Sequence, residues 1–280
     1  MRYGFVIPGG DARLSAELAA EAEAAGWDGV FIPDGIYIEN FPTYDPWVVL
    51  SAIAMRTERV RIGPMLTPVP RRRPWKLARE TMTLDQLSNG RLILAVGLGT
   101  LDDGGFTKVG EPTERKVRAQ RLDEGLEILA GLWSGQPFAY HGEQYNVEEM
   151  TFLPKPVQQP RIPVWVVGAW PKQRSMARAA RWDGLLPYKP SDGSAYGAEL
   201  TPDDIREMRA FITQHRQATT PYDIVMEGAT PGDDPARAAE IIGPFVAAGI
   251  TWWLESMWTA AADSTEVLTR IRQGPPRLSE

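Results

Sequence analysis

A regular alternation of short apolar runs with helical patterns most constrains the fold of this chain, and it repeats eight times. Several of the short runs are apolar throughout, as expected for parallel strands that are covered on both faces. Eight such units predict an α/β fold, the TIM (β/α)8 barrel. The predicted strands are 3–7, 29–32, 60–65, 92–96, 164–167, 184–186, 222–226 and 251–254. The predicted helices are 12–25, 46–55, 74–87, 115–133, 172–181, 202–217, 235–248 and 265–272.

Capping residues support the predicted helix ends. Asp45-Pro46, Thr201-Pro202 and Asp234-Pro235 each place a capping side chain before a proline at the first helical position. Gly26 and Gly249 follow predicted helices at the point where a left-handed residue is favoured. These signals fix the boundaries of the repeated units.

One stretch interrupts the alternation, between the fourth helix and the fifth strand. "FAYHGEQYNVEEMTF" alternates around His141-Gly142 and predicts a small hairpin, and the proline-rich "PKPVQQPRIP" follows it. We interpret residues 134–163 as an insertion in the barrel. No stretch has the composition of a linker, so we expect residues 1–280 to form a single domain.

Composition narrows the class of protein. The absence of cysteine excludes disulfides, thiolate metal sites and a cysteine nucleophile, and a net charge of −6 argues against nucleic acid as a partner. No apolar run approaches the roughly 20 residues of a membrane span, and the start of the chain does not have the pattern of a signal peptide. We therefore expect a cytoplasmic protein. The aspartate pairs at 102–103, 203–204 and 233–234 lack partner histidines, so we expect no metal site.

The stretch "NGRLILAVGLGT" suggests a ligand at the end of the fourth strand. It is not a dinucleotide fingerprint, because the next glycines after Gly97 and Gly99 are Gly104 and Gly105, which miss the required spacing. A glycine-rich loop at a strand end still offers backbone N–H groups to an anion. From the residues alone, relief of crowding at the barrel rim explains the glycines equally well.

Three stretches carry a resemblance to a known family: "TERVRIGPMLTPVPRRRPWKLARETMTLDQLSNGRLILAVGLG", "LDEGLEILAGLWSG" and "PRIPVWVVGAWP". They resemble the bacterial luciferase-like superfamily of flavin- and F420-dependent oxidoreductases and monooxygenases, over about residues 1–190. The resemblance implies a TIM barrel with an insertion, usually a homodimer, that binds FMN or F420 with the ring in the barrel mouth. It also implies an oxidoreductase that acts on a small organic substrate.

The resemblance assigns two groups of residues to the cofactor. The loops at 97–99 and 168–170 would bind its phosphate. The segment around Pro64 and Met65 would lie behind its ring, with a non-proline cis peptide at Pro64–Met65. The helix that opens at Pro171 would aim its N-terminus at the phosphate. The implied cofactor-binding residues are Pro64, Met65, Thr67, Gly97, Leu98, Gly99, Gly168, Ala169 and Trp170.

The chain departs from the family pattern at two polar positions. Many relatives end the second strand with Asp-His, where this chain has Asp34-Gly35, and F420-dependent sugar dehydrogenases have a Glu where this chain has Thr100. Asp34 and Tyr37 are the candidate catalytic residues, and Asp34 is alternatively a buried structural carboxylate. Both histidines are expected at the surface. Further residues expected to line the pocket are Tyr188, Glu227, Glu255 and Trp258.

Two alternatives stay open from the sequence. Arg71, Arg72 and Arg73 precede a helix whose dipole they oppose, so they either bind an anion, such as the acidic tail of F420, or form a solvated surface run. Because these arginines could bind the acidic tail of F420, we slightly favour F420 over FMN as the cofactor. The second alternative concerns activity, because the missing histidine and glutamate also suit a non-catalytic flavin-binding protein of the same fold.

Overall fold

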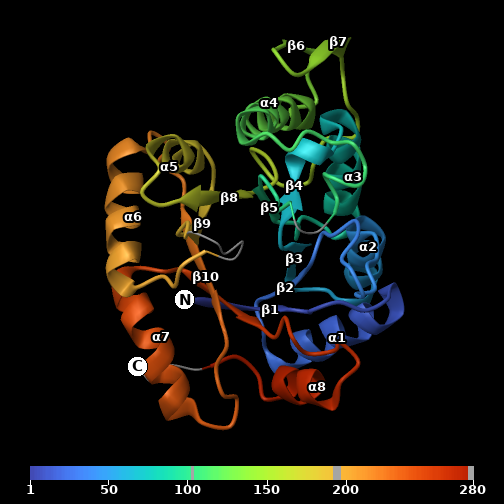
Figure 1. The fold of residues 1–280 in the computed structure, drawn as a ribbon. Coiled ribbons are helices and arrows are strands. Elements are labelled where there is room, and N and C mark those ends of the chain that lie inside the picture. The colour runs from blue at the N-terminus through green and yellow to red at the C-terminus, as the bar shows by residue number, and fades with distance from the viewer. Residues whose placement is uncertain (102–103, 192–196, 277–280) are drawn as a thin grey trace.

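The computed structural model describes residues 1–101, 104–191 and 197–276. Helices surround a parallel sheet, with α5, α6 and α7 on one side and α1 to α4 on the other (Figure 1). The strands of the main sheet are β1 (Arg2–Val6), β2 (Gly29–Ile32), β3 (Arg61–Pro64), β4 (Thr67–Pro68), β5 (Leu94–Gly97), β8 (Val164–Ala169), β9 (Gly184–Tyr188), β10 (Asp223–Gly228) and β11 (Trp252–Ser256). The helices are α1 (Ala12–Ala25), α2 (Pro46–Arg56), the 3-10 turn η1 (Val69–Arg71), α3 (Pro74–Leu87), α4 (Arg115–Trp133), α5 (Gln173–Ala180), α6 (Pro202–His215), α7 (Pro235–Ala248) and α8 (Thr265–Arg272).

The sheet closes on itself. Its strand order is β3-β2-β1-β11-β10-β9-β8-β5-β4, and every neighbouring pair is parallel. A parallel bridge between Ile62 and Leu92 joins β3 to the run that leads into β5. The predicted barrel is therefore confirmed, with strands from the two ends of the chain, β1 and β11, side by side.

The predicted third strand is present as β3, and a short further strand, β4, follows it after a break at Met65 and Leu66. The backbone N–H of Met65 still donates to the Ile32 carbonyl at 2.7 Å, so register with β2 continues through this residue. Pairing resumes at Thr67, opposite Val96 of β5. The non-proline cis peptide lies between them, at Met65–Leu66, one bond later than the predicted Pro64–Met65.

The predicted hairpin is present as β6 (Phe138–His141) and β7 (Asn146–Met150), an antiparallel pair that forms its own sheet. It projects beyond α4, away from the barrel strands (Figure 1). The predicted caps are also present: the side chains of Asp45, Thr201 and Asp234 accept backbone N–H bonds at the starts of α2, α6 and α7.

Two apolar layers hold the barrel together. The outer layer lies between strands and helices, and the inner layer fills the barrel with nine residues: Val6, Phe31, Ile93, Ala95, Trp165, Leu186, Val225, Trp252 and Leu254. Trp165 is central to the inner layer, since its ring centroid lies 5.4 Å from that of Phe31 and 5.3 Å from that of Trp252. The barrel is thus a packed core, and a ligand site must lie above this layer.

Candidate functional site

The carboxyl ends of the strands carry the inward-facing residues above the inner core. Successive strand residues point to opposite faces, so the residue two places after an inner-layer residue also points inward. Unlike the fully buried inner layer, the inward positions here are partly exposed. We call this set the barrel mouth; it consists of Met65, Leu66, Val167, Tyr188, Glu227 and Ser256.

The barrel mouth has an apolar side and a polar side. Met65 and Leu66, which lie between β3 and β4, and Val167 of β8 pack on the inner core. Tyr188 and Glu227 follow Leu186 and Val225 by two residues, on the adjacent strands β9 and β10. A flat apolar ring with polar atoms at one edge would suit this arrangement, since ligand sites are mostly apolar with a few placed polar groups.

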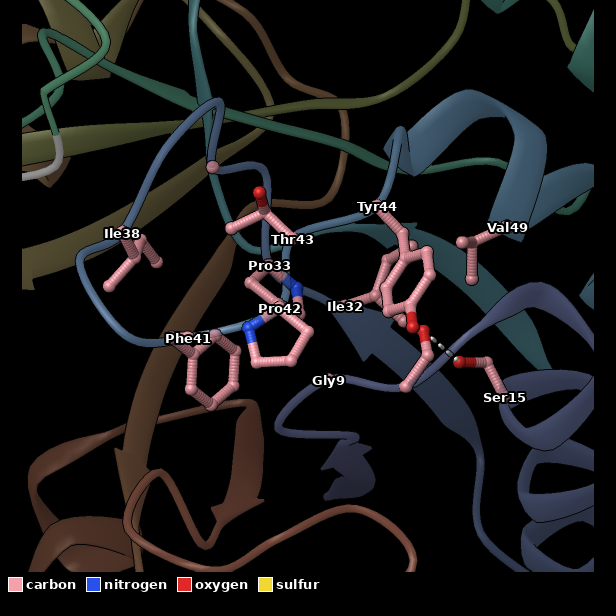
Figure 2. Close-up of a pocket in the computed structure, with 12 residues that line it drawn as sticks. Gly9, Ser15, Ile32, Pro33, Ile38, Phe41, Pro42, Thr43, Tyr44 and Val49 are labelled. Carbon is pink, nitrogen blue, oxygen red and sulfur yellow. Dashed lines mark hydrogen bonds between the residues drawn. The ribbon is translucent and has the colours of Figure 1, made fainter.

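A small cavity lies beside the mouth, under the loop after β2. Figure 2 shows Phe41, Pro42 and Tyr44 of this loop over Gly9, with Ser15 on the helix side. Its volume is about 30 Å³. That is room for a water molecule, whereas ligand pockets begin at about 300 Å³. This cavity is therefore no cofactor site.

The Asp34 carboxylate lies in a buried ion-pair network, which supports the structural interpretation of this residue, and its catalytic role stays a prediction. Its side chain is fully buried, and it accepts hydrogen bonds from Thr67 Oγ1 at 2.8 Å and Arg72 Nη2 at 2.6 Å. Arg71, also fully buried, donates to the Asp34 carbonyl at 2.7 Å and lies 3.8 Å from its carboxylate. Asp34 follows outward-facing Ile32 by two residues, so it faces away from the barrel mouth.

This cluster also corrects the surface interpretation of the arginines. Arg71 and Arg72 are bound to Asp34, and only the third arginine of the run, Arg73, is exposed. Their anionic partner is a carboxylate of the protein itself. They give no support for F420 over FMN.

Apolar atoms of the loop after β2 fill the space beside Gly35, the position at which the sequence lacks a histidine. A Cβ atom at Gly35 would lie 3.2 Å from Ile38 Cδ1, so apolar loop atoms already occupy the direction in which a side chain would point. Tyr37 on the same loop is 42% exposed, and Lys108 Nζ lies 5.0 Å from its ring centroid. The structure thus leaves Tyr37 accessible to a ligand, and its catalytic role stays a prediction.

The loop after β5 is fixed by contacts with its neighbours. Gly99 has a φ of 76°, and an added Cβ would lie 2.7 Å from Pro68 and 2.8 Å from Phe106. Arg118 of α4 donates to the Gly99 carbonyl at 2.9 Å and to that of Leu98 at 3.4 Å. Arg118 and Phe106 are site residues that the sequence does not predict, and the Arg118 guanidinium lies 5.2 Å from the centroid of the Phe106 ring. Nothing in their local pattern distinguishes them from ordinary helix and loop residues.

The loop after β8 is less suited to the predicted phosphate. The backbone N–H of Ala169 donates to Ser175 Oγ at 2.9 Å, and that of Trp170 donates to the Tyr188 carbonyl at 2.8 Å. The Trp170 indole turns towards α6, where its Nε1 donates to Glu207 at 3.2 Å. A Cβ at Gly168 would lie 2.3 Å from Leu185 Cδ1, so this glycine serves close packing. These two N–H groups are engaged within the protein, and α5 begins at Gln173, two residues later than expected.

Two carboxyl groups at the ends of β10 and β11 have opposite surroundings. Glu255 is buried and points outward, where it accepts from Thr230 Oγ1 at 2.7 Å and pairs with Arg270 at 3.3 Å. Glu227 points into the barrel mouth and accepts a hydrogen bond from Trp258 Nε1. Burial raises the pKa of the Glu227 carboxyl, and hydrogen bonds from Trp258 and Ser256 oppose part of this rise.

Both histidines lie away from the barrel mouth, as predicted. His141 is exposed on the hairpin and contacts Asn146. His215, at the end of α6, stacks on Phe211 with ring centroids 3.9 Å apart. Across the described ranges, no three histidine or acidic side chains gather as a metal site requires. No helix within these ranges has the length and apolarity to cross a bilayer.

The fold and the barrel mouth define a TIM-barrel protein with a ligand site at the carboxyl ends of its strands. The sequence profile of the luciferase-like monooxygenase family matches residues 5–269, and the chain therefore belongs to this family.

Two curated relatives and one solved structure show which kinds of protein the chain is similar to. The chain is 31% identical over 193 residues to the F420-dependent glucose-6-phosphate dehydrogenase of Nakamurella multipartita, covering 67% of this chain and 55% of that protein. It is 29% identical over 206 residues to the FMNH(2)-dependent dimethylsulfone monooxygenase of Pseudomonas putida, covering 71% and 54%. Monooxygenase RslO1 from Streptomyces bottropensis has a TM-score of 0.78 at 20% identity, covering 98% of this chain and 97% of that one. The chain thus spans about half the length of these curated relatives.

Proposed function

We propose that this protein is a flavin-type oxidoreductase or monooxygenase that uses F420 or FMN to act on a small organic substrate. The observation that carries the proposal is the barrel mouth. The apolar residues Met65, Leu66 and Val167 stand beside the polar residues Tyr188 and Glu227, above a packed inner core. Membership of the luciferase-like monooxygenase family supports it, because named relatives include F420- and FMNH(2)-dependent enzymes.

The residues present fit a flavin-type ring better than they fit the predicted phosphate contacts. The apolar side of the mouth offers a surface for the ring, and the loop of Gly97, Leu98 and Gly99 stands beside it. The cofactor supplies the hydride or oxygen transfer, while the protein supplies orientation and a water-poor site. Pro64 and Thr67 are buried, and Thr67 binds Asp34, so these two residues would act by supporting the mouth.

A binding titration tests the proposal. Purified protein is titrated separately with FMN and with F420, and the cofactor absorbance and fluorescence are followed. Saturable binding of one of them is expected, which also decides between the two cofactors. Failure of both to bind would reject the proposal. Steady-state turnover of the loaded protein with a reductant and candidate substrates then separates an enzyme from a flavin-binding protein without activity.

We also infer a homodimer and a single domain. Pairing of β1 with β11 supports one domain, because it joins the two ends of the chain in one sheet. A dimer is supported by apolar residues on one side of α2, where Val48 is 63% and Met55 is 73% exposed. Light scattering of wild type and of Val48→Asp tests the dimer. Location in the cytoplasm stays a prediction.

A further inference from the structure

The carboxyl group of Glu227 stands at the centre of a small polar group in the barrel mouth. Glu227 lies opposite Leu254 in the pairing of β10 with β11, and both residues point inward. The next residue to point inward on β11 is Ser256, and on β9 Tyr188 takes the corresponding position. Trp258, which follows β11, reaches back to donate its indole N–H to Glu227. Three strands thus direct polar groups to one place.

Glu227 differs from Asp34 and Glu255 in forming no ion pair with a basic side chain of the part of the chain that the structure describes. Asp34 is bound by Arg71 and Arg72, and Glu255 is paired with Arg270. Among the described residues, the groups that act on the pKa of Glu227 are the hydrogen-bond donors Trp258 and Ser256, and no charged side chain is among them. Burial without a cation raises the pKa of this carboxyl above its ordinary value of 4.5. A carboxyl of this kind holds its proton closer to neutral pH than an exposed one does.

We propose that Glu227 is the proton-transfer residue of the barrel mouth, in place of the imidazole that this chain lacks at position 35. The inference rests on the proposed function, since it needs a ligand in the mouth whose charge changes during turnover. The Glu227 carboxyl O–H bond breaks, and its proton passes to the ligand atom that gains negative charge. The carboxylate that remains accepts the Trp258 N–H bond, with the Ser256 hydroxyl lowering its pKa, and it regains a proton from solvent. In the opposite direction, the carboxylate takes the proton.

The geometry explains why this residue is suited to the task. A general acid works best with a pKa near the working pH, and burial moves the pKa of Glu227 in that direction. Trp258 and Ser256 stabilise the charged form, so the proton can also leave. Because Trp258 is 42% exposed and stands at the rim, the group keeps a route to solvent.

The first test uses the protein without cofactor. Carboxyl groups are labelled with 13C-glutamate, and the Glu227 signal is assigned as the one lost in Glu227→Gln. We expect it to titrate above 4.5. Trp258→Phe removes a donor to the carboxylate, so the pKa of Glu227 should rise further in that variant. A pKa at or below 4.5, or no response to Trp258→Phe, would overturn the inference.

The second test uses the cofactor selected by the binding titration. Glu227→Gln keeps the shape and an acceptor for Trp258, so cofactor affinity should change less than twofold. Turnover should fall by about 100-fold or more, since general acid–base catalysis typically contributes about 10²–10⁴-fold. Glu240→Gln removes an exposed glutamate from α7 and is the control, with wild-type turnover expected. Equal turnover of Glu227→Gln and wild type would contradict the role of Glu227 and leave the proposed function intact. Failure of the wild-type protein to bind either cofactor would contradict the proposed function.

Discussion

Asp34 and Glu227 are two carboxyl residues at strand ends of the same barrel, and their surroundings are opposite. Asp34 is fully buried beside two arginines, on the outer side of β2. Glu227 is partly exposed on the inner side of β10, with an indole and a hydroxyl as its donors. Both lie at the end of an apolar run in the sequence, so the neighbouring residues do not distinguish the two carboxyl groups.

The difference follows from which face of the strand each residue occupies. Ile32, two residues before Asp34, belongs to the outer core, while Val225, two residues before Glu227, belongs to the inner core. Alternation along a strand then sends Asp34 towards the helices and Glu227 into the mouth. In this barrel, the face of the strand decides whether an acidic residue at the strand end supports the structure or faces a ligand. The residue type alone does not show which of the two it does.

Asp34→Asn should have the largest effect, because it removes the charge that balances buried Arg71 and Arg72. Removing one member of a buried ion pair usually lowers the free energy of unfolding by about 3–5 kcal/mol. We expect about 3 kcal/mol here, since Arg72 keeps some contact with solvent. Urea unfolding followed by circular dichroism measures it.

Glu227→Gln is the matched control for that change, because it also replaces a carboxylate by an amide at a strand end. It should not lower the free energy of unfolding at pH 7 by more than about 0.5 kcal/mol, because no ion pair is broken and the neutral amide replaces a carboxylate whose charged form is disfavoured by burial. If the two variants lose equal stability, the distinction between the outer and the inner acid is wrong.

Two glycines extend the comparison to the loops. An added Cβ at Gly168 meets Leu185 and Met176 in the outer layer, whereas at Gly97 it meets Leu66 and Val167 of the mouth, at 3.0 and 3.1 Å. Gly168→Ala should therefore lower stability by about 2 kcal/mol through overpacking. Gly97→Ala should cause less destabilisation and instead weaken cofactor binding. Unfolding and binding titrations of both variants check this, and the reverse pattern would contradict it.

Much of this fold can be predicted from the sequence, because local signals agree with it. Caps such as Asp45 and Thr201, and glycines such as Gly26, predict helix bounds to within a few residues. The site is less predictable, because Asp34 meets Arg71 only through contacts between separate units. The cis peptide likewise lies one bond away from its predicted position, at Met65–Leu66.

A smaller effect concerns the pH dependence of stability. Because folding raises the pKa of Glu227, its protonated form stabilises the folded state below pH 4.5, and this contribution is lost as the pH rises through the folded-state pKa. Glutamine stays neutral throughout. Glu227→Gln should therefore gain stability relative to wild type as the pH rises from 4 to 8. Unfolding free energies measured across this range decide it, and a relative loss at high pH would show that the carboxylate is favoured by folding.

Replacing both histidines by glutamine should have the smallest effect of all. His141 is exposed on the β6–β7 hairpin, and His215, at the end of α6, contacts the ring and carbonyl of Phe211. Surface changes of this kind usually alter stability by less than about 0.5 kcal/mol. The double variant contains no imidazole, so its cofactor affinity and turnover should stay close to wild type. Its pH–rate profile should keep the fall in rate that occurs as the pH rises through the pKa of Glu227, because Glu227 must be protonated to donate, whereas an imidazole would titrate near its ordinary pKa of about 6.5. A double variant that folds and binds cofactor but loses turnover would show that the reactive centre is not at the inner end of β10.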